Sequence, residues 1–355
     1  MIMAKPGQPK NRVRAQRLEH GWSQVDLANR AGISRAAVSA VEIGRLVPSV
    51  AAALSLAQAF GCTVEDLFGE GSAGQPDASP WAWAIAKEPC RYWQAAVGGR
   101  VLSYAVEPTA AGLLEHDGVF QNGSFHTTSR YMPERTLVIA SCDPAAGLLA
   151  AEVNRLGACR VIVLPRSSQE ALALLAKGLV HVAGLHLSTD DSPNGNRAAV
   201  RSRIDSDCCL LHVARWQEGV ALSSKSRLCS VQAVVRSKAR WVAREPGSGA
   251  RQCLDELLHH RTLRRVARDH RGVAEAVRCD WADAGVCVRL VCEEAGLQFL
   301  SVREEVYQLC FRAEFQDDRR IRALKDAVRS ASYRRLLGEL PGYSPSACGE
   351  LESVN

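Results

Sequence analysis

The sequence contains no run of about 18 uninterrupted apolar residues, the length that a membrane-spanning helix requires. The N-terminal residues, MIMAKPGQPKNR, also lack the apolar core of a secretory signal peptide. We therefore expect a cytoplasmic protein with no membrane partner.

Cysteine pairs at metal-binding or redox spacing are absent as well. The chain holds 13 cysteines, an odd number, and none of them forms a C-x-x-C pair. In a cytosolic chain, scattered thiols are more often small core residues than disulfides or metal ligands. His181 and His186 lie five residues apart, which fits no zinc motif. We predict no metal and no cofactor, with His181 in the core and His186 a candidate pocket residue near a strand end.

Two common catalytic signatures are missing. The G-x-x-x-x-G-K-[ST] loop of nucleotide hydrolases does not occur. Cys142 stands beside Asp143, yet the sequence pairs no histidine with it for nucleophilic catalysis. We predict that the protein is not an enzyme, and an enzyme with a DNA-binding appendage stays open as the alternative.

The chain does have the length for several hydrophobic cores and a basic N-terminal segment. Its 355 residues exceed one ordinary domain core. Residues 1–50 carry eight Lys or Arg against three Asp or Glu, which favours a polyanionic partner. Shifts in composition predict a domain over 1–69, a linker over 70–80, a small β unit over 81–131, an α/β domain over 132–345 and a tail over 346–355.

Residues 23–44, SQVDLANRAGISRAAVSAVEIG, have the pattern of two short helices joined by a glycine turn. Ser23 and Ser34 are candidate N-caps, and Gly32 supplies the turn. Over residues 11–69 the spacing resembles the Cro and phage-repressor (Xre) class, including the flanking helices NRVRAQRLEHG and VPSVAAALSLAQAFG. The resemblance implies an all-α, five-helix domain that places one helix in the major groove of a double-stranded DNA operator.

The resemblance also implies which side chains contact DNA. Gln24 would contact a phosphate, and Arg35 is the long side chain that could read guanine through O6 and N7. Arg17 and Glu42 occupy the positions of a buried ion pair in this class. The predicted DNA-binding residues are Ser23, Gln24, Ser34, Arg35, Ala36, Ser39 and Arg45. A helical bundle that binds protein instead of DNA remains the alternative.

Beyond residue 131, strands alternate with helices of about a dozen residues, which indicates βαβ units and a parallel sheet. Three strand-to-helix turns carry small polar residues: ASCDPAAG (140–147), LPRSSQE (164–170) and REPGSGAR (244–251). Backbone N–H groups at helix starts attract anions, and Arg251 would add a bidentate fork. If the strands are neighbours in one sheet, these turns face one crevice.

The crevice defines the predicted ligand-binding residues. Asp283 could be a pocket residue or a helix cap, and the sequence does not separate the two roles. The predicted set is Ser141, Cys142, Asp143, Ser167, Ser168, His186, Ser248, Gly249, Arg251 and Asp283.

Over residues 136–343 the chain resembles the type 2 periplasmic-binding-protein fold, in the PBP-like form found fused to helix-turn-helix modules or to molybdopterin-biosynthesis proteins. The motifs that carry the resemblance are LAKGLVHVAGLHL (175–187), ARWQEGVAL (214–222), WVAREPGSGAR (241–251), DWADAGVCV (280–288) and LLGELPGY (336–343). It implies two α/β lobes with a ligand between them, and relatives that bind oxyanions such as molybdate.

Taken together, these features lead us to expect a bacterial transcription regulator that binds an operator as a homodimer and senses a small anionic ligand or oxyanion. A dedicated sensor of molybdate or molybdenum cofactor remains the alternative within the same class.

Overall fold

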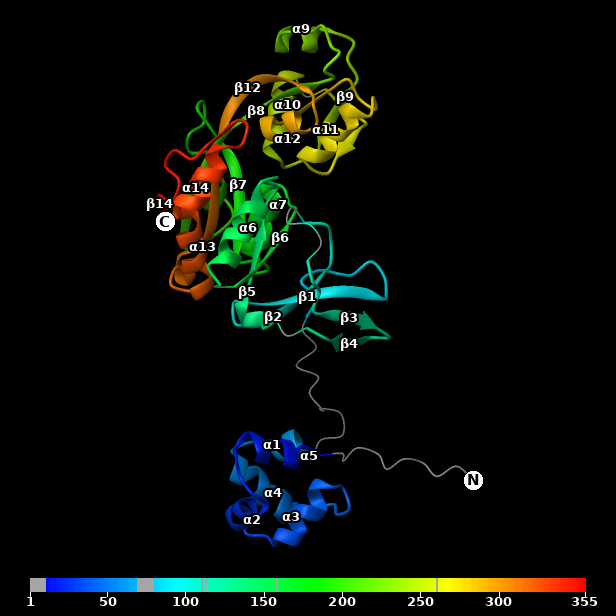
Figure 1. The fold of residues 1–355 in the computed structure, drawn as a ribbon, viewed down its shortest axis with the longest axis vertical. Helices are drawn as coiled ribbons and strands as arrows, with labels where there is room; N and C mark the ends of the chain where they lie inside the picture. Colours follow the sequence, from blue (N-terminus) through cyan, green and yellow to red (C-terminus); the bar gives the residue numbers. More distant parts are fainter. Residues whose placement is uncertain are drawn as a thin grey trace, which may run out of the picture. The chain divides into compact units, whose positions relative to one another are not determined.

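The structure is a computed structural model that describes residues 11–68, 80–109, 112, 114–129, 131–157, 159–259 and 261–355. The chain divides into two compact units, residues 1–78 and 79–355 (Figure 1). The predicted linker over 70–80 lies outside the described residues except for Pro80. The predicted domain limits therefore remain predictions. Among the described residues, no helix combines the length and the apolar character that crossing a bilayer demands.

The N-terminal unit consists of short helices whose ends are set by local capping. Ser23 caps α2 by accepting from the Asp26 N–H, and the Asp26 carboxylate accepts from the Ser23 N–H in return. Gly32 then adopts the left-handed conformation (φ 64°), and Ser34 caps α3. The helices are α1 (Val13–Glu19), α2 (Gln24–Ala31), α3 (Arg35–Glu42), α4 (Val50–Phe60) and α5 (Val64–Phe68).

One small core holds these helices together. Leu27 of α2, Val38 of α3 and Leu56 of α4 are fully buried in a single cluster. Because apolar residues recur every three or four positions, each helix turns one face inward and leaves the other exposed.

The second unit begins with a small antiparallel sheet in the order β2-β1-β3-β4. Its strands are β1 (Cys90–Val97), β2 (Arg100–Ala105), β3 (Gly118–Gln121) and β4 (Ser124–Thr127). Trp93 and Leu102 share one buried cluster with Val138 and Ile162 of the next sheet. This sheet therefore packs against the α/β part of the unit (Figure 1).

The larger sheet has the order β10-β9-β11-β8-β12-β7-β5-β6, with β13 and β14 added to β8. Strands β5, β6 and β7 are parallel neighbours, and so are β9, β10 and β11. The strands are β5 (Thr136–Ala140), β6 (Arg160–Leu164), β7 (Val182–Thr189), β8 (Cys208–Leu222), β9 (Trp241–Arg244), β10 (Val266–Ala267), β11 (Ala284–Val288), β12 (Gln298–Arg312), β13 (Tyr343–Ser344) and β14 (Leu351–Val354).

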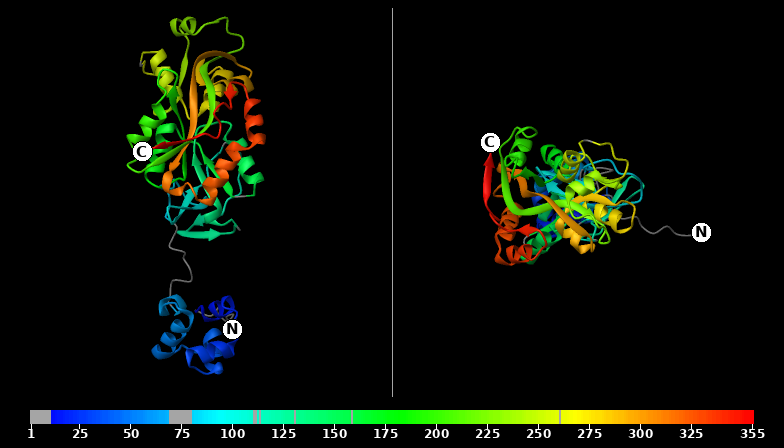
Figure 2. Two further views of the ribbon diagram at one scale, coloured as in Figure 1. Left: turned by 90° about the vertical axis from the view of Figure 1, so that its left-hand side faces the viewer. Right: turned by 90° about the horizontal axis from the view of Figure 1, so that it is seen from above.

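Two long antiparallel strands, β8 and β12, join the two lobes. One end of β8 pairs with β11, while β12 pairs with β7 toward its carboxyl end. Both strands pass from the first lobe, around β5–β7, to the second lobe, around β9–β11 (Figures 1 and 2). Strand β14, within the segment predicted as a tail, extends the first lobe by pairing with β8.

Helices cover both lobes, as expected for a parallel sheet whose two faces must be buried. In the first lobe these are α6 (Ala146–Arg155), α7 (Ser168–Ala176), α8 (Gly195–Arg201), α13 (Arg319–Arg329) and α14 (Ala331–Gly338), and in the second α9 (Val231–Arg236), α10 (Gly249–Leu257), α11 (His270–Arg278) and α12 (Arg289–Glu294). Short 3-10 turns occupy Pro133–Arg135 and Ala313–Phe315. The predicted two-lobed α/β fold behind a helical N-terminal domain is confirmed.

Candidate functional site

The helix-turn-helix presents its predicted DNA-contacting side chains on one face. On α3, Arg35 and Ala36 are exposed and Ser39 is half-buried, whereas Val38 and Val41 point into the core. Both caps, Ser23 and Ser34, are exposed, as is Arg45 beyond the helix. The helical period thus separates a solvent-facing side of α3 from its core-facing side.

A buried ion pair fixes α3 against the rest of the N-terminal unit. Arg17 Nε lies 2.6 Å from Glu42 Oε1, and both side chains are buried. Gln24 donates to the second carboxylate oxygen of Glu42 at 2.9 Å. Burial acts in the opposite direction, but the bonds from Arg17 and Gln24 hold the pKa of Glu42 below its ordinary value. The predicted position of the Arg17–Glu42 pair is confirmed, and Gln24, predicted as a phosphate contact, is bonded to Glu42.

In the second unit, a cavity of about 380 Å³ lies between loops of the two lobes. The first lobe contributes the turn after β5, and the second contributes the start of α11. The lining residues are Pro108, Thr109, Gly112, Ser141, Cys142, Asp143, Pro144, Val163, Pro165, Asp269, His270 and Arg271.

The turn after β5 is held rigidly by buried hydrogen bonds. Ser141 Oγ lies 2.7 Å from the Tyr307 hydroxyl, and Tyr343 donates to Asp143 Oδ1 at 2.7 Å. Asp143 also accepts from the Ala145 N–H at 2.8 Å. Burial raises the pKa of Asp143 to about 6, although these donors oppose the shift.

Behind this turn, Cys142 meets a histidine from another strand. Cys142 Sγ lies 2.9 Å from His186 Nε2, and His186 Nδ1 lies 2.7 Å from Glu305 Oε2. The Trp216 indole donates to the same Glu305 oxygen at 3.0 Å, while Arg303 bonds the other oxygen at 2.6 Å. Glu305 and Trp216 are paired across β12 and β8. The residues that hold His186 in place therefore lie on the strands that join the lobes.

Charges in this cluster act strongly on one another because the side chains are buried. Burial opposes protonation of His186, but Cys142 and Glu305 hold its pKa well above the usual value. Despite burial, His186 and Arg303 hold the pKa of Glu305 below its usual value. The ion pair between His186 and Glu305 is therefore expected to persist at neutral pH.

Two further buried groups beside the cavity keep unsatisfied polar atoms. Arg244, at the end of β9, is 1 % exposed; its Nε and Nη2 bond Glu245, and its Nη1 has no partner among the described residues. His270, also 1 % exposed, has no described hydrogen-bond partner at either ring nitrogen. Burial and then the Arg244 charge lower the pKa of His270 well below its ordinary value. Unsatisfied buried polar atoms indicate a missing partner, such as a ligand.

The structure brings several predicted ligand residues to this cluster. Ser141, Cys142 and Asp143 line the cavity, and the His186 N–H bonds Ser168 Oγ at 3.2 Å. A Cβ added at Gly249 would lie only 2.7 Å from His186 Nδ1, so the start of α10 packs directly against the histidine. His186, which the sequence placed near a strand end, lies within β7.

Other predicted ligand residues are engaged elsewhere. Arg251 pairs with Asp255 at 2.8 Å, one helical turn away, so it does not present a free fork. Asp283 pairs with Arg240 at 2.7 Å on the surface. Ser167 and Ser248 serve as N-caps of α7 and α10. REPGSGAR lines a separate cavity together with two acids, Asp255 and Glu256, which does not favour an anion there. That the loop holds an anion through Arg251 stays a prediction.

The sequence did not predict three features of the site: Arg244, His270 and the hydrogen bond from Trp216 to Glu305. Arg244 is the first residue of REPGSGAR and ends a strand, which is a signal that could have found it. His270 follows Asp269, whose carboxylate caps α11 by accepting from the Gly272 N–H. The pairing of Trp216 with Glu305 depends on strand register and leaves no local trace in the sequence.

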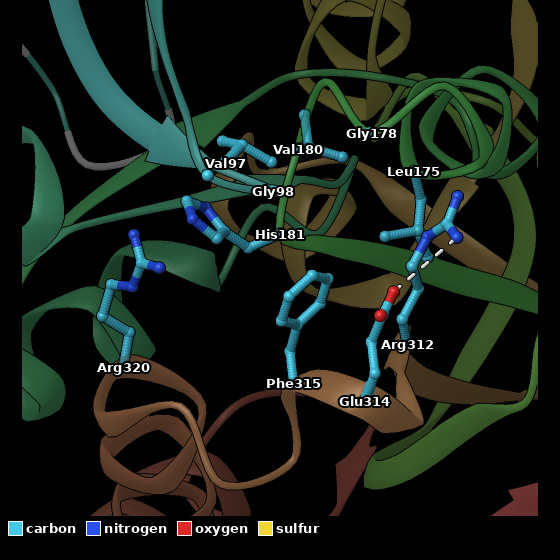
Figure 3. A pocket seen from close by; sticks show the side chains of 11 residues that line it. Val97, Gly98, Leu175, Gly178, Val180, His181, Arg312, Glu314, Phe315 and Arg320 are labelled. Atoms are coloured by element: carbon cyan, nitrogen blue, oxygen red, sulfur yellow. Dashed lines mark ion pairs between the residues drawn. The ribbon is translucent and has the colours of Figure 1, made fainter.

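A third cavity, of about 450 Å³, is lined by residues that include His181, Arg312, Glu314 and Arg320 (Figure 3). His181 Nδ1 accepts from the Val138 N–H, and its Nε2 contacts the Ala96 carbonyl at 2.8 Å. Arg320, which lines the same cavity, bonds Asp318 and the Ala96 carbonyl. His181 is therefore a packing histidine, as the sequence suggested.

Comparison with known protein families finds two matches. Residues 150–329 match the PBP superfamily domain, and residues 13–67 match a helix-turn-helix family. The uncharacterized protein YvgK of Bacillus subtilis is 23 % identical over 197 residues, which cover 52 % of this chain and 63 % of YvgK. The chain thus spans less than two thirds of that relative.

The N-terminal unit has relatives of its own. The uncharacterized HTH-type transcriptional regulator YgzD of B. subtilis is 41 % identical over 59 residues, 17 % of this chain and 89 % of YgzD. A regulator of the same description from Methanocaldococcus jannaschii is 39 % identical over 59 residues, with the same shares of each chain.

Solved structures resemble the second unit at low identity. PhnD1 of Prochlorococcus marinus, in complex with methylphosphonate, is 11 % identical with a TM-score of 0.43, covering 61 % of this chain and 95 % of its own. An ABC-type phosphate transport receptor from Vibrio cholerae is 13 % identical with a TM-score of 0.41, covering 57 % and 97 %.

Proposed function

This chain belongs to the PBP superfamily and carries an Xre-type helix-turn-helix domain, and from that premise we propose that its binding to operator DNA responds to a small anionic molecule held between the two lobes. One observation carries the proposal. The cavity of about 380 Å³ is lined by residues from both lobes, so a ligand inside it would favour the closed arrangement over an open one.

The charges around the cavity support an anion. Arg271 lines the cavity directly. The buried Arg244 lies close enough to the lining residues Cys142 and Asp269 to interact with them electrostatically. His270 and Arg271, the first residues of α11, line the same cavity, and the start of a helix favours negative charge. The carboxylates of Asp143 and Asp269 are already bonded to their own donors, which limits their repulsion of an anion.

For the N-terminal unit we propose that Arg35 reads a base while Ser34, Ser39 and Arg45 contact the operator around it. Two copies of the chain would bind together, because one such module covers little DNA and operators of this class contain paired half-sites. Molybdate is one of the oxyanions that this proposal includes, so a dedicated molybdate sensor is a special case of it.

An enzymatic function is the second candidate, and one arrangement favours it. Cys142, His186 and Glu305 have the order and spacing of a nucleophile, a base and an orienting acid, with contacts of 2.9 and 2.7 Å. The sequence argument against catalysis relied on the lack of a paired histidine, and the fold supplies one. Release of a product from a bound compound by the full chain would favour this candidate over a sensor.

The test of the anion proposal uses the full chain with phosphate, sulfate and molybdate. An anion that binds the folded protein should raise its melting temperature in proportion to the logarithm of its concentration. Arg244→Met should remove that rise and keep a cooperative melting transition. The matched control is Arg240→Met, four residues earlier and half-exposed in a surface pair with Asp283. Equal anion responses in the two variants would contradict the proposal.

A further inference from the structure

We propose that Cys142, His186 and His270 together bind a thiophilic transition-metal ion, with Zn²⁺ as the reference ion, at the floor of the cavity between the lobes. The Cys142 sulfur and one ring nitrogen from each of the two histidines lie within 4.8 Å of one another. One thiolate and two imidazoles are a donor set that suits Zn²⁺, Cu⁺ or Ni²⁺ and does not suit Mg²⁺ or Ca²⁺.

The three residues come from both lobes. Cys142 follows β5 and His186 lies in β7 of the first lobe, whereas His270 begins α11 of the second lobe. The rings of His186 and His270 have centroids 6.0 Å apart. A metal ion coordinated by all three would cross-link the lobes in the closed arrangement.

His186 already has the orientation of a metal ligand. Metal-binding histidines usually donate their second ring N–H to a carboxylate, and His186 Nδ1 lies 2.7 Å from Glu305. Because Glu305 accepts at Nδ1, the other nitrogen, Nε2, is the one directed at Cys142. A metal ion would replace the proton at Nε2. Trp216 and Arg303 hold Glu305 in turn, so the orientation does not depend on one contact.

His270 supplies an independent observation. Only 1 % of this residue is exposed, and neither ring nitrogen has a partner among the described residues. Leaving such a buried group unpaired destabilises the folded protein. Coordination would satisfy one nitrogen, whereas a cysteine nucleophile with His186 as its base would leave His270 unexplained.

A neighbouring group of possible ligands does not fit a cation. His186, Glu218 and Glu305 also lie close together, but Arg303 is already paired with both carboxylates, at 3.1 and 2.6 Å. The guanidinium therefore occupies the place that a metal ion would take there.

Three protein ligands leave a fourth coordination position, and Cys142 and His270 both line the cavity. An anionic ligand could complete the coordination there while Arg244 balances its charge. This part of the inference rests on the proposed function, because it uses the same cavity.

The experiment is titration of the reduced, chelator-treated full chain with Co²⁺, followed by displacement with Zn²⁺. A tetrahedral site with a thiolate ligand gives Co²⁺ an intense thiolate-to-metal charge-transfer absorption, which Zn²⁺ should abolish. Wild-type protein should show this absorption with a single equivalent of bound metal. Cys142→Ser should lose the absorption, and His270→Gln should lower the affinity at least as much as the roughly 10–100-fold typical of losing a supporting group.

Cys159→Ser is the matched control, because Cys159 is also buried in the second unit and lies outside the cluster. It should bind Co²⁺ like the wild type. The proposal is overturned if wild-type protein gives no thiolate absorption, or if Cys142→Ser and Cys159→Ser behave alike. Modification of Cys142 by iodoacetamide at the same rate with and without stoichiometric Zn²⁺ would also overturn it.

A separate measurement tests the proposed function: the effect of phosphate, sulfate and molybdate on DNA binding by the chelator-treated protein. An anion response without metal binding overturns only the metal site. Metal binding without any effect of metal or anion on DNA affinity leaves the metal site standing and overturns the sensor.

Discussion

The two units of this chain place their polar side chains differently. In the N-terminal unit the side chains proposed to contact DNA lie on α3 or next to its ends, and Ser34, Arg35 and Arg45 are exposed while Ser39 is half-buried. In the second unit, His186 and Glu305 are fully buried and paired with each other, and the buried Arg244 is paired with Glu245. Exposed charges are screened by salt and act almost independently, whereas buried charges depend on each partner. Substitutions on the exposed DNA-contacting surface should therefore act independently of one another. A substitution in the buried cluster should affect all the residues that interact with the changed one.

The largest expected effect comes from breaking the buried group. Glu305→Ala would leave His186 as a buried cation without its carboxylate, while Arg303 would keep Glu218 and Glu256. Breaking this buried pair should lower the free energy of unfolding of the second unit by about 3–5 kcal/mol. Glu304→Ala is the matched control, because the adjacent Glu304 is half-exposed and pairs with Arg215 at the surface. That change should cost about 0–1 kcal/mol. Urea unfolding measures both, and similar losses would contradict the comparison.

The Arg17–Glu42 pair is buried but lies in the N-terminal unit. It therefore tests whether the loss of stability on breaking an ion pair depends on its burial or on the unit that contains it. Glu42→Gln would leave Arg17 with the Trp22 carbonyl, 2.7 Å from Nη1, as its remaining strong acceptor. We expect a loss of about 1.5–3 kcal/mol in the stability of the N-terminal unit, the range for a hydrogen bond to a charged group. Thermal unfolding followed through Trp22 fluorescence would report it. A loss within the error of the measurement would mean that the pair does not stabilise the helix packing.

On the exposed face the expected loss falls on DNA binding and spares stability. Arg35→Ala should cost about 1–3 kcal/mol on a selected operator and relax the preference at one base pair. The melting temperature should not change, since Arg35 is exposed and outside the core. Unchanged affinity and preference in Arg35→Ala would remove the residue from the recognition surface.

A smaller, pH-dependent effect is expected at His181. Burial, and then the charge of Arg320, lower its pKa from 6.5 to about 4, so the folded protein binds this proton less readily than the unfolded chain. Stability should therefore fall as the pH drops from about 6.5 toward 4, where protonation breaks the bond from the Val138 N–H. Asp143, with a pKa raised to about 6, works in the opposite direction. The test is the difference between wild type and His181→Gln, and equal pH slopes in the two would contradict it.

The smallest effect is expected at Arg251, which the sequence had singled out. Since Arg251 pairs with Asp255 one turn along α10, Arg251→Ala should alter stability by about 0.5 kcal/mol or less and should not alter the response to phosphate, sulfate or molybdate. Calorimetry with and without the anion checks both. Loss of the anion response in this variant would restore the original assignment of REPGSGAR.

Local signals explain what the sequence could predict. Ser23, Gly32 and Ser34 define the two helices of the motif because capping and positive φ depend on neighbours within a few positions. The alternation of strands and helices predicted the lobes for the same reason.

The candidate site depends on contacts that no local pattern carries. Cys142, His186 and His270 are separated by 44 and then by many more residues, and only the strand order brings them together. The prediction of no metal was based on the spacing of cysteines and histidines along the chain. That spacing identifies a zinc finger, but it does not identify a site whose ligands come from two lobes. The pairing of Arg251 with Asp255, by contrast, follows a four-residue helical spacing that the sequence already contained.

The measurement that tests the central claim most directly is operator affinity of the full chain with phosphate, sulfate or molybdate, each with and without Zn²⁺, together with the affinity for the same compound with and without operator. If the cavity between the lobes controls the N-terminal unit, a compound that binds should change operator affinity, and operator should change the affinity for that compound by the same factor, typically about 5–150-fold. If compounds that raise the melting temperature leave operator affinity unchanged, the two units are uncoupled and the account is contradicted.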